Sequence, residues 1–224
     1  MLRLSADGGL RLTVPRRGSI EGGLRFVAGQ TDWINRERAR MAERGQPWTA
    51  GTELWWRGER VRLQWSEDGR AIVCGDQRIR VRRTAPVTAA PVPSSTAQPS
   101  LFDVGETSPQ DVRAEVEAQL RAVATVELPP RLLALAREHR VDVRRVSVRN
   151  QRARWGACSS TGTITLNWRL LQMPSWVCDY VLLHELMHRR QPNHSRRFWR
   201  EVASVCPDWR EAERWIRKHG RTIL

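Results

Sequence analysis

A proline-rich stretch without basic residues divides the sequence into two parts. Residues 84–110 read TAPVTAAPVPSSTAQPSLFDVGETSPQ, with five of the chain's 12 prolines and no Lys or Arg. Such a composition is typical of a linker, because it cannot bury enough apolar surface to offset the entropy lost on ordering. We therefore expect an α+β chain with a small N-terminal α+β module over 1–83, a disordered linker over 84–110 and a second domain over 111–224.

Hydrophobic periodicity predicts the elements of the first module. The inner face of its helix would carry Phe26, Trp33 and Ile34. We find no catalytic constellation in this module and place the chemistry in the second domain. The expected elements are a strand over 10–15, a helix over 22–45, and strand pairs over 53–65 and 71–83 with turns at Arg57-Gly58-Glu59 and Gly75-Asp76-Gln77.

The second domain is expected to combine helices with a small antiparallel sheet. Pro129-Pro130 suits the first turn of a helix, where a missing N–H costs nothing. The predicted elements are helices over 111–125 and 129–140, a strand over 142–150, a hairpin over 153–168 with its turn at 159–162, and helices near 174–190, 195–205 and 208–218.

The sequence His184-Glu185-Leu186-Met187-His188 ends an apolar run that begins at Val177 and that we expect to be helical. Residues four apart lie on one face of an α-helix, so the two imidazoles can bind one Zn²⁺. Glu185 can then reach a zinc-activated water as general base. The stretch predicts metal-assisted hydrolysis, most readily of a peptide bond.

Catalytic zinc usually takes a third protein ligand, and the best placed is His194. On a continued helix, six residues after His188 would turn it to the opposite face, but Pro192 ends the helix and lets the chain return. Asn193 and Ser195 suit the N-cap of the next helix. Imidazole also suits Fe, Ni and Cu, although zinc is preferred. Alternative third ligands are Glu201, Glu211 and Glu213.

Three motifs of the second domain resemble the YgjP-type zinc metallopeptidases, relatives of the SprT and Spartan proteases. They read RWGACSSTGTITLNWRL, DYVLLHELMH and PNHSRRFW. The resemblance covers 111–224 closely and the first module more loosely, through VPRR, DWI and WWRGERVRL. It implies a zincin-like domain in which His184, His188 and His194 bind zinc and Glu185 is the catalytic base. Ala157 departs from it, since Ser is expected there.

Analogy with other zinc peptidases suggests further roles around this site. An edge strand beside the metal helix, either 163–166 or 154–157, would pair with extended substrate. Phe198 and Trp199 would pack the following helix onto the metal helix and hold His194 in place. The candidates for a donor to the developing oxyanion are Arg189, Arg190, Tyr180 and Asn167.

The charge of the chain bears on its partners. The net charge is +14, and 37 of the 38 basic residues are Arg, with Lys218 as the exception. Arginine binds phosphate bidentately and stacks on bases, so the excess is consistent with nucleic acid as well as with a solvated surface. The basic clusters lie at 131–154, with eight Arg and two acidic residues, and at 189–221, with ten basic and four acidic residues.

A nucleic-acid-associated protease is the more specific version of the peptidase hypothesis. A nucleic-acid-binding protein with structural zinc and a hydrolase of other amides are the alternatives.

A short peptide in the linker is similar to those that dock on the bacterial replicative sliding clamp. Gln98, Leu101 and Phe102 fit Gln-x-x-Leu-Phe, with two apolar anchors in a polar segment. Five residues make a weak motif, so the match defines a test rather than a partner.

The chain carries no sign of export or of membrane insertion. Its four cysteines are scattered, its first residues lack a signal-peptide core, and no apolar run approaches the length of a membrane span. We therefore expect a cytoplasmic protein with reduced thiols.

Overall fold

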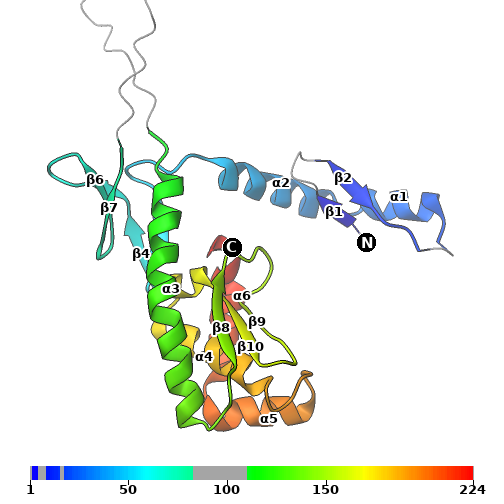
Figure 1. The fold of residues 1–224 in the computed structure, drawn as a ribbon. Helices are drawn as coiled ribbons and strands as arrows, with labels where there is room; N and C mark the ends of the chain where they lie inside the picture. Colours follow the sequence, from blue (N-terminus) through cyan, green and yellow to red (C-terminus); the bar gives the residue numbers. More distant parts are fainter. Residues whose placement is uncertain (1, 5–8, 16–17, 83–109, 224) are drawn as a thin grey trace, which may run out of the picture. The chain divides into compact units, whose positions relative to one another are not determined.

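The computed structural model describes residues 2–4, 9–15, 18–82 and 110–223 (Figure 1). They belong to two compact units, Met1–Pro47 and Trp48–Leu224. The boundary between units therefore follows Pro47, whereas the sequence predicted one after residue 83. Gln98, Leu101 and Phe102, together with almost all of the predicted linker, lie outside the described residues.

The first unit contains a strand pair and two helices. Strands β1 (Leu2–Leu4) and β2 (Leu10–Leu12) are antiparallel, and helices α1 (Ile20–Ala28) and α2 (Thr31–Gly45) follow. The single helix expected over 22–45 is thus two, because the chain leaves the helix at Gly29-Gln30. Ile34 is buried as predicted, but Phe26 is about half exposed and does not belong to an inner face.

The second unit begins with two small antiparallel sheets. The first pairs β3 (Glu53–Trp56) with β4 (Glu59–Arg62), and the second has the order β5-β6-β7. Both predicted turns are confirmed, and each contains a glycine with positive φ. The bounds of the second sheet are β5 (Gln64–Trp65), β6 (Ala71–Cys74) and β7 (Gln77–Arg80).

The turn between β3 and β4 joins this region to the rest of the second unit. The backbone N–H groups of Arg57 and Gly58 donate to the carbonyls of Leu171 and Gln172, at 2.9 and 3.1 Å. A Cβ on Gly58 would lie 2.7 Å from Pro174, so glycine permits the close approach. These contacts explain why the β3–β7 region belongs to the same unit as the C-terminal helices.

A single long helix, α3 (Arg113–Glu138), replaces the two predicted helices, 111–125 and 129–140, of which the second was expected to begin at Pro129-Pro130. Each proline removes a backbone donor, which normally breaks a helix. Here one side of the helix is buried at every fourth residue, and this continuous contact outweighs the lost bonds. The buried side chains are Val116, Leu120, Ala124, Leu128, Leu132 and Ala136.

The sheet beside α3 is mixed rather than antiparallel. It contains β8 (Arg145–Arg149), β9 (Gly156–Cys158) and β10 (Thr163–Asn167) in the order β8-β10-β9. The β9–β10 hairpin and its turn are confirmed, but β8 pairs with β10 in parallel. Parallel pairing requires a crossover connection, which alternation of apolar residues does not reveal.

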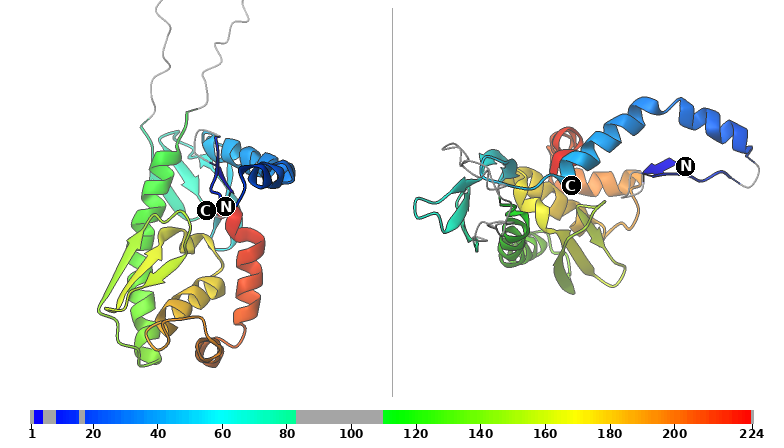
Figure 2. Two further views of the ribbon diagram at one scale, coloured as in Figure 1. Left: turned by 90° about the vertical axis from the view of Figure 1, so that its right-hand side faces the viewer. Right: turned by 90° about the horizontal axis from the view of Figure 1, so that it is seen from above.

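The remaining elements pack around one central helix. They are the 3₁₀ helix η1 (Trp168–Gln172) and helices α4 (Ser175–Met187), α5 (Arg196–Val205) and α6 (Trp209–Ile223). Helix α4 contacts α3, β9, β10, α5 and α6, which accounts for its being apolar almost all round. Figures 1 and 2 show α3 alongside the sheet and α5 at the end where α3 stops. In the described part of the chain, no helix has both the length and the apolar character that crossing a bilayer requires.

Candidate metal centre

Three histidines meet at the C-terminal end of α4. His184 and His188 lie one turn apart, and the Nε2 atoms of His184 and His194 are 3.0 Å apart. One ring nitrogen from each of the three imidazoles lies within 4.8 Å of the others. Two nitrogens bound to one tetrahedral zinc lie about 3.4 Å apart, so this donor set matches a single ion. Within the described residues it is the only such group of His, Cys, Asp or Glu.

The chain returns His194 to the site through the break at Pro192. Helix α4 ends in a tight turn in which Arg190 and Gln191 both donate to the carbonyl of Met187. Ser195 is the N-cap of the next helix, α5, and its hydroxyl accepts from the N–H of Phe198. The helix thus ends at Met187 and not near residue 190 as predicted, while the predicted return of His194 to the other two histidines is confirmed.

The alternative third ligands do not join the group. Glu201 forms an ion pair with Arg190 at 2.9 Å, and Glu211 forms one with Arg214 at 3.3 Å. Glu213 comes nearer to the site, but its carboxylate accepts from a phenol rather than facing the three imidazoles.

Aromatic rings surround the three imidazoles. Phe198 is fully buried, and its ring stacks on His188 with centroids 4.5 Å apart. Its edge contacts extend to His184 and His194, at 4.9 and 4.8 Å. Trp199 stacks on His194, so the packing predicted for both aromatic residues is present.

The outward nitrogens of two imidazoles have their own partners. Nδ1 of His188 lies 3.2 Å from the carbonyl oxygen of Gln191, and Nδ1 of His184 lies 3.4 Å from the hydroxyl of Tyr180. Burial and, to a smaller extent, the neighbouring imidazoles of His188 and His194 together lower the pKa of His184 to about 3. Burial also lowers the pKa of His188. Both rings are therefore neutral near pH 7, the form that binds metals.

Glu185 lies on α4 against strand β9. Its side chain is buried and makes no hydrogen bond to any described residue. A Cβ on Gly156 would lie 2.6 Å from Oε1 of Glu185, so the carboxylate occupies space that only glycine leaves free. Burial raises the pKa of Glu185 to about 7, and the positive charge of Arg154 offsets part of this rise. A carboxyl group with such a pKa can both accept and release a proton near neutrality.

A cavity of about 320 Å³ opens beside Glu185 and His184. Trp155 and Ile216 give it apolar walls, while Tyr180 and Glu213 add polar groups. The cavity thus combines an apolar lining with a few converging polar groups, as ligand-binding clefts commonly do.

The structure shows which of the residues proposed as substrate-binding strand or oxyanion donor are free for that role. Strand β10 is central in its sheet, so 163–166 cannot be the free edge, whereas 154–157 reaches into the edge strand β9. Three of the four oxyanion candidates are engaged elsewhere: Arg189 donates to the carbonyls of Asp142 and Ser160, Arg190 to that of His139, and Asn167 to those of Gln151 and Arg154. Tyr180 is the candidate that lines the cavity.

A helix that bears two histidines and an intervening buried glutamate, with a third histidine returned by the next turn, is the arrangement of metal-dependent hydrolases. The chain belongs to the YgjP-like, metallopeptidase domain family, whose family model matches residues 1–219. It is therefore a metallopeptidase, and the expected family resemblance is confirmed. Hydrolysis of peptide bonds thus takes precedence over the alternatives of a structural zinc site and of other amides.

One solved structure is also similar to this chain. The crystal structure of the metallopeptidase zymogen of Pyrococcus abyssi, abylysin, matches with 30% sequence identity over 39% of this chain and 90% of that chain, with a TM-score of 0.35. Among curated proteins no match is found.

Proposed function

We propose that this metallopeptidase uses His184, His188 and His194 to bind Zn²⁺ and Glu185 as its general base. The observation that carries the proposal is the convergence of three ring nitrogens within 4.8 Å beside a buried carboxylate. Three neutral imidazoles leave one position of a tetrahedral ion open, as catalytic zinc requires. A zinc ion held there would supply Lewis-acid chemistry, which acidifies water and polarises the scissile carbonyl.

The chain's own residues would bind the substrate and move the proton. Glu185 would take a proton from the attacking water at a carboxylate oxygen and pass it to the leaving amine. Strand β9 is the edge strand of its sheet and contacts α4, so backbone groups on its unpaired side can pair with an extended peptide as an added strand. The apolar walls at Trp155 and Ile216 would hold a side chain of that peptide.

The experiment that tests this function is the substitution Glu185→Gln. The variant keeps the size of the side chain but cannot accept the proton, so we expect peptide hydrolysis to fall by about 1000-fold. Metal analysis should find the zinc content unchanged, and Glu211→Gln on an exposed part of α6 should keep full activity. Undiminished hydrolysis by Glu185→Gln would refute the assigned role.

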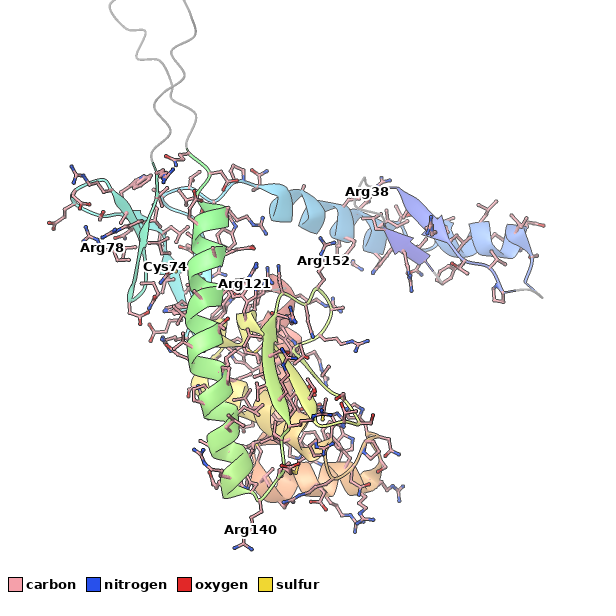
Figure 3. All side chains as sticks on the ribbon, in the orientation of Figure 1. Arg38, Cys74, Arg78, Arg121, Arg140 and Arg152 are labelled. Carbon is pink, nitrogen blue, oxygen red and sulfur yellow. The ribbon has the colours of Figure 1, made fainter. Side chains whose placement is uncertain are left out.

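Nucleic acid is a second partner that we propose from charge. Arg145, Arg149 and Arg152 are exposed and form no ion pair with any described residue. Figure 3 places Arg140 at the C-terminal end of α3 and Arg152 beyond the C-terminal end of β8, and guanidinium groups of this kind can contact phosphates. Proteolysis stimulated by DNA, and declining with salt, would support this partner. Equal rates with and without DNA at low salt would exclude it.

The linker peptide is proposed separately as a ligand of the bacterial sliding clamp. Gln98, Leu101 and Phe102 would supply the polar and apolar anchors of a short disordered motif. Calorimetry of a peptide spanning 96–104 with the purified clamp decides the matter. No heat of binding at high micromolar concentration would end the proposal.

A further inference from the structure

We infer that Tyr180 and Glu213 form a hydrogen-bond relay that fixes the tautomer and the orientation of His184. Tyr180 would then be a positioning residue and not a donor to the substrate. The inference rests on the proposed function, because it assigns these residues a role toward the metal ligand His184. The relay joins the side chains of Tyr180 and Glu213, which come from different helices, α4 and α6.

The distances place the phenol oxygen between two polar atoms. Tyr180 precedes His184 by four residues on α4, so the two side chains share a face. The phenol oxygen lies 3.4 Å from Nδ1 of His184 and 3.3 Å from Oε1 of Glu213. The rings of Tyr180 and His184 meet edge to face, with centroids 5.8 Å apart.

The chemistry of the three groups leaves one consistent arrangement of protons. A phenol has one hydrogen to donate, and an ionised carboxylate can only accept. The hydroxyl of Tyr180 therefore donates to Glu213 and accepts from the Nδ1–H of His184. With its hydrogen on Nδ1, the imidazole keeps a free lone pair on Nε2, the atom that lies 3.0 Å from Nε2 of His194.

A second imidazole of the site is oriented in the same way by a different partner. Nδ1 of His188 lies 3.2 Å from the carbonyl oxygen of Gln191, which can only accept. Its hydrogen must again sit on Nδ1, which leaves Nε2 free. Metal-binding histidines commonly donate their other ring N–H in this manner, and loss of the acceptor weakens metal binding.

The same geometry argues against Tyr180 as an oxyanion donor. Although its side chain lines the cavity, its only hydrogen is committed to Glu213. The residue is also buried, with only 4% of its surface exposed. The relay further explains why Glu213 faces the site without belonging to the group of three imidazoles.

The test measures the zinc affinity of the full chain by competition with a chelator. In Tyr180→Phe the Nδ1–H of His184 loses its acceptor, so we expect zinc affinity to fall by about 10- to 100-fold. Peptide hydrolysis should fall at limiting zinc and recover when zinc is in excess. An oxyanion donor would give the opposite result, with unchanged zinc affinity and a loss of turnover that excess zinc does not restore.

A double-mutant cycle tests the link between the two residues. Glu213→Ala should weaken zinc binding by about 10-fold in the wild-type background and add less than about twofold in the Tyr180→Phe background, because Glu213 acts through the phenol. Glu211→Ala is the matched control on the same helix, with a carboxylate that pairs with Arg214 in solvent. Glu213 is only partly buried, so its variant keeps the test usable if Tyr180→Phe unfolds.

The outcomes distinguish this inference from the proposed function. A wild-type chain that binds no zinc would refute both. A wild-type chain that binds zinc and hydrolyses peptides, combined with a Tyr180→Phe variant of unchanged zinc affinity, would overturn the relay alone. Additive effects in the cycle would likewise show that Glu213 does not act through Tyr180.

Discussion

Gly156 controls the position of Glu185 more directly than any charged neighbour does. Strand β9 runs so close to α4 that a methyl group at this residue would overlap the carboxylate. The atoms in the way would be Cγ, Oε1 and Cδ of the Glu185 side chain, at 2.5, 2.6 and 2.7 Å, and not backbone, so Glu185 would move while the fold remained. The proposed base is thus held by a neighbouring strand as well as by its own helix.

We therefore predict that Gly156→Ala lowers peptide hydrolysis by about 100-fold, since a catalytic group displaced by about 1 Å commonly costs that much. Zinc content and the unfolding temperature should change little. Ala157→Ser is the matched control, because adjacent side chains on a strand point to opposite faces. Equal activity of Gly156→Ala and wild type would show that Glu185 tolerates displacement.

Residues close together in the sequence account for the part of the site that could be predicted. His184, Glu185 and His188 follow from helical periodicity, and His194 follows from the break at Pro192. Tyr180 also lies four residues before His184, so periodicity could have indicated their contact. Gly156 could not be found in this way, and Glu213 was named only as an alternative metal ligand, because both reach the site through the packing of β9 and α6 against α4.

At the scale of elements, helix α3 is where local sequence signals fail. Pro129 and Pro130 each remove a backbone donor, yet the helix continues because Leu128 and Leu132 are fully buried on either side of them. To predict that the buried side of the helix continues past the prolines, one must know which elements pack against it. Proline propensity alone cannot supply that knowledge.

We predict that Pro130→Ala raises the free energy of unfolding by about 1–2 kcal/mol, because the new N–H can donate within the helix. Part of the gain is offset by a more flexible unfolded chain. Denaturant unfolding measures the change, and Leu133→Ala, at an exposed position of the same helix, is the control. A loss of stability in Pro130→Ala would indicate that α3 depends on a bend at the prolines.

Hairpins were the elements that the sequence predicted best. The turns at 57–59, 75–77 and 159–162 combine glycine with flanking apolar alternation, and all three are present. The parallel partner of β10 was not predictable, since β8 is separated from it by β9 and its loops. Local patterns identify turns, whereas the order of strands depends on packing.

At the scale of the molecule, the β3–β7 region completes the catalytic unit. The amide of Gln172 donates to the carbonyl of Trp55 at 3.0 Å, in addition to the two backbone bonds from the β3–β4 turn. Trp56 and Leu63 are buried in the same core cluster as α4. The predicted division after residue 83 would cut through this core.

We predict that a fragment of residues 48–224 folds and binds zinc, whereas a fragment of 111–224 does not fold cooperatively. The shorter fragment would expose several large apolar side chains, each contributing about 1.5–3 kcal/mol when buried. Thermal unfolding followed by circular dichroism, with zinc content as a second readout, compares the two. A cooperative transition of 111–224 at the temperature of the longer fragment would contradict the assignment.

His194 differs from the other two histidines in where it is held. His184 lies on α4 and His188 directly follows its last residue, and both are half-buried, while His194 is exposed on the turn before α5. A turn can open without unfolding the core, and such local openings are far more frequent than global unfolding. A bound ion would therefore escape by losing His194 first, and its residence time would depend on the stability of one turn and not on that of the whole fold.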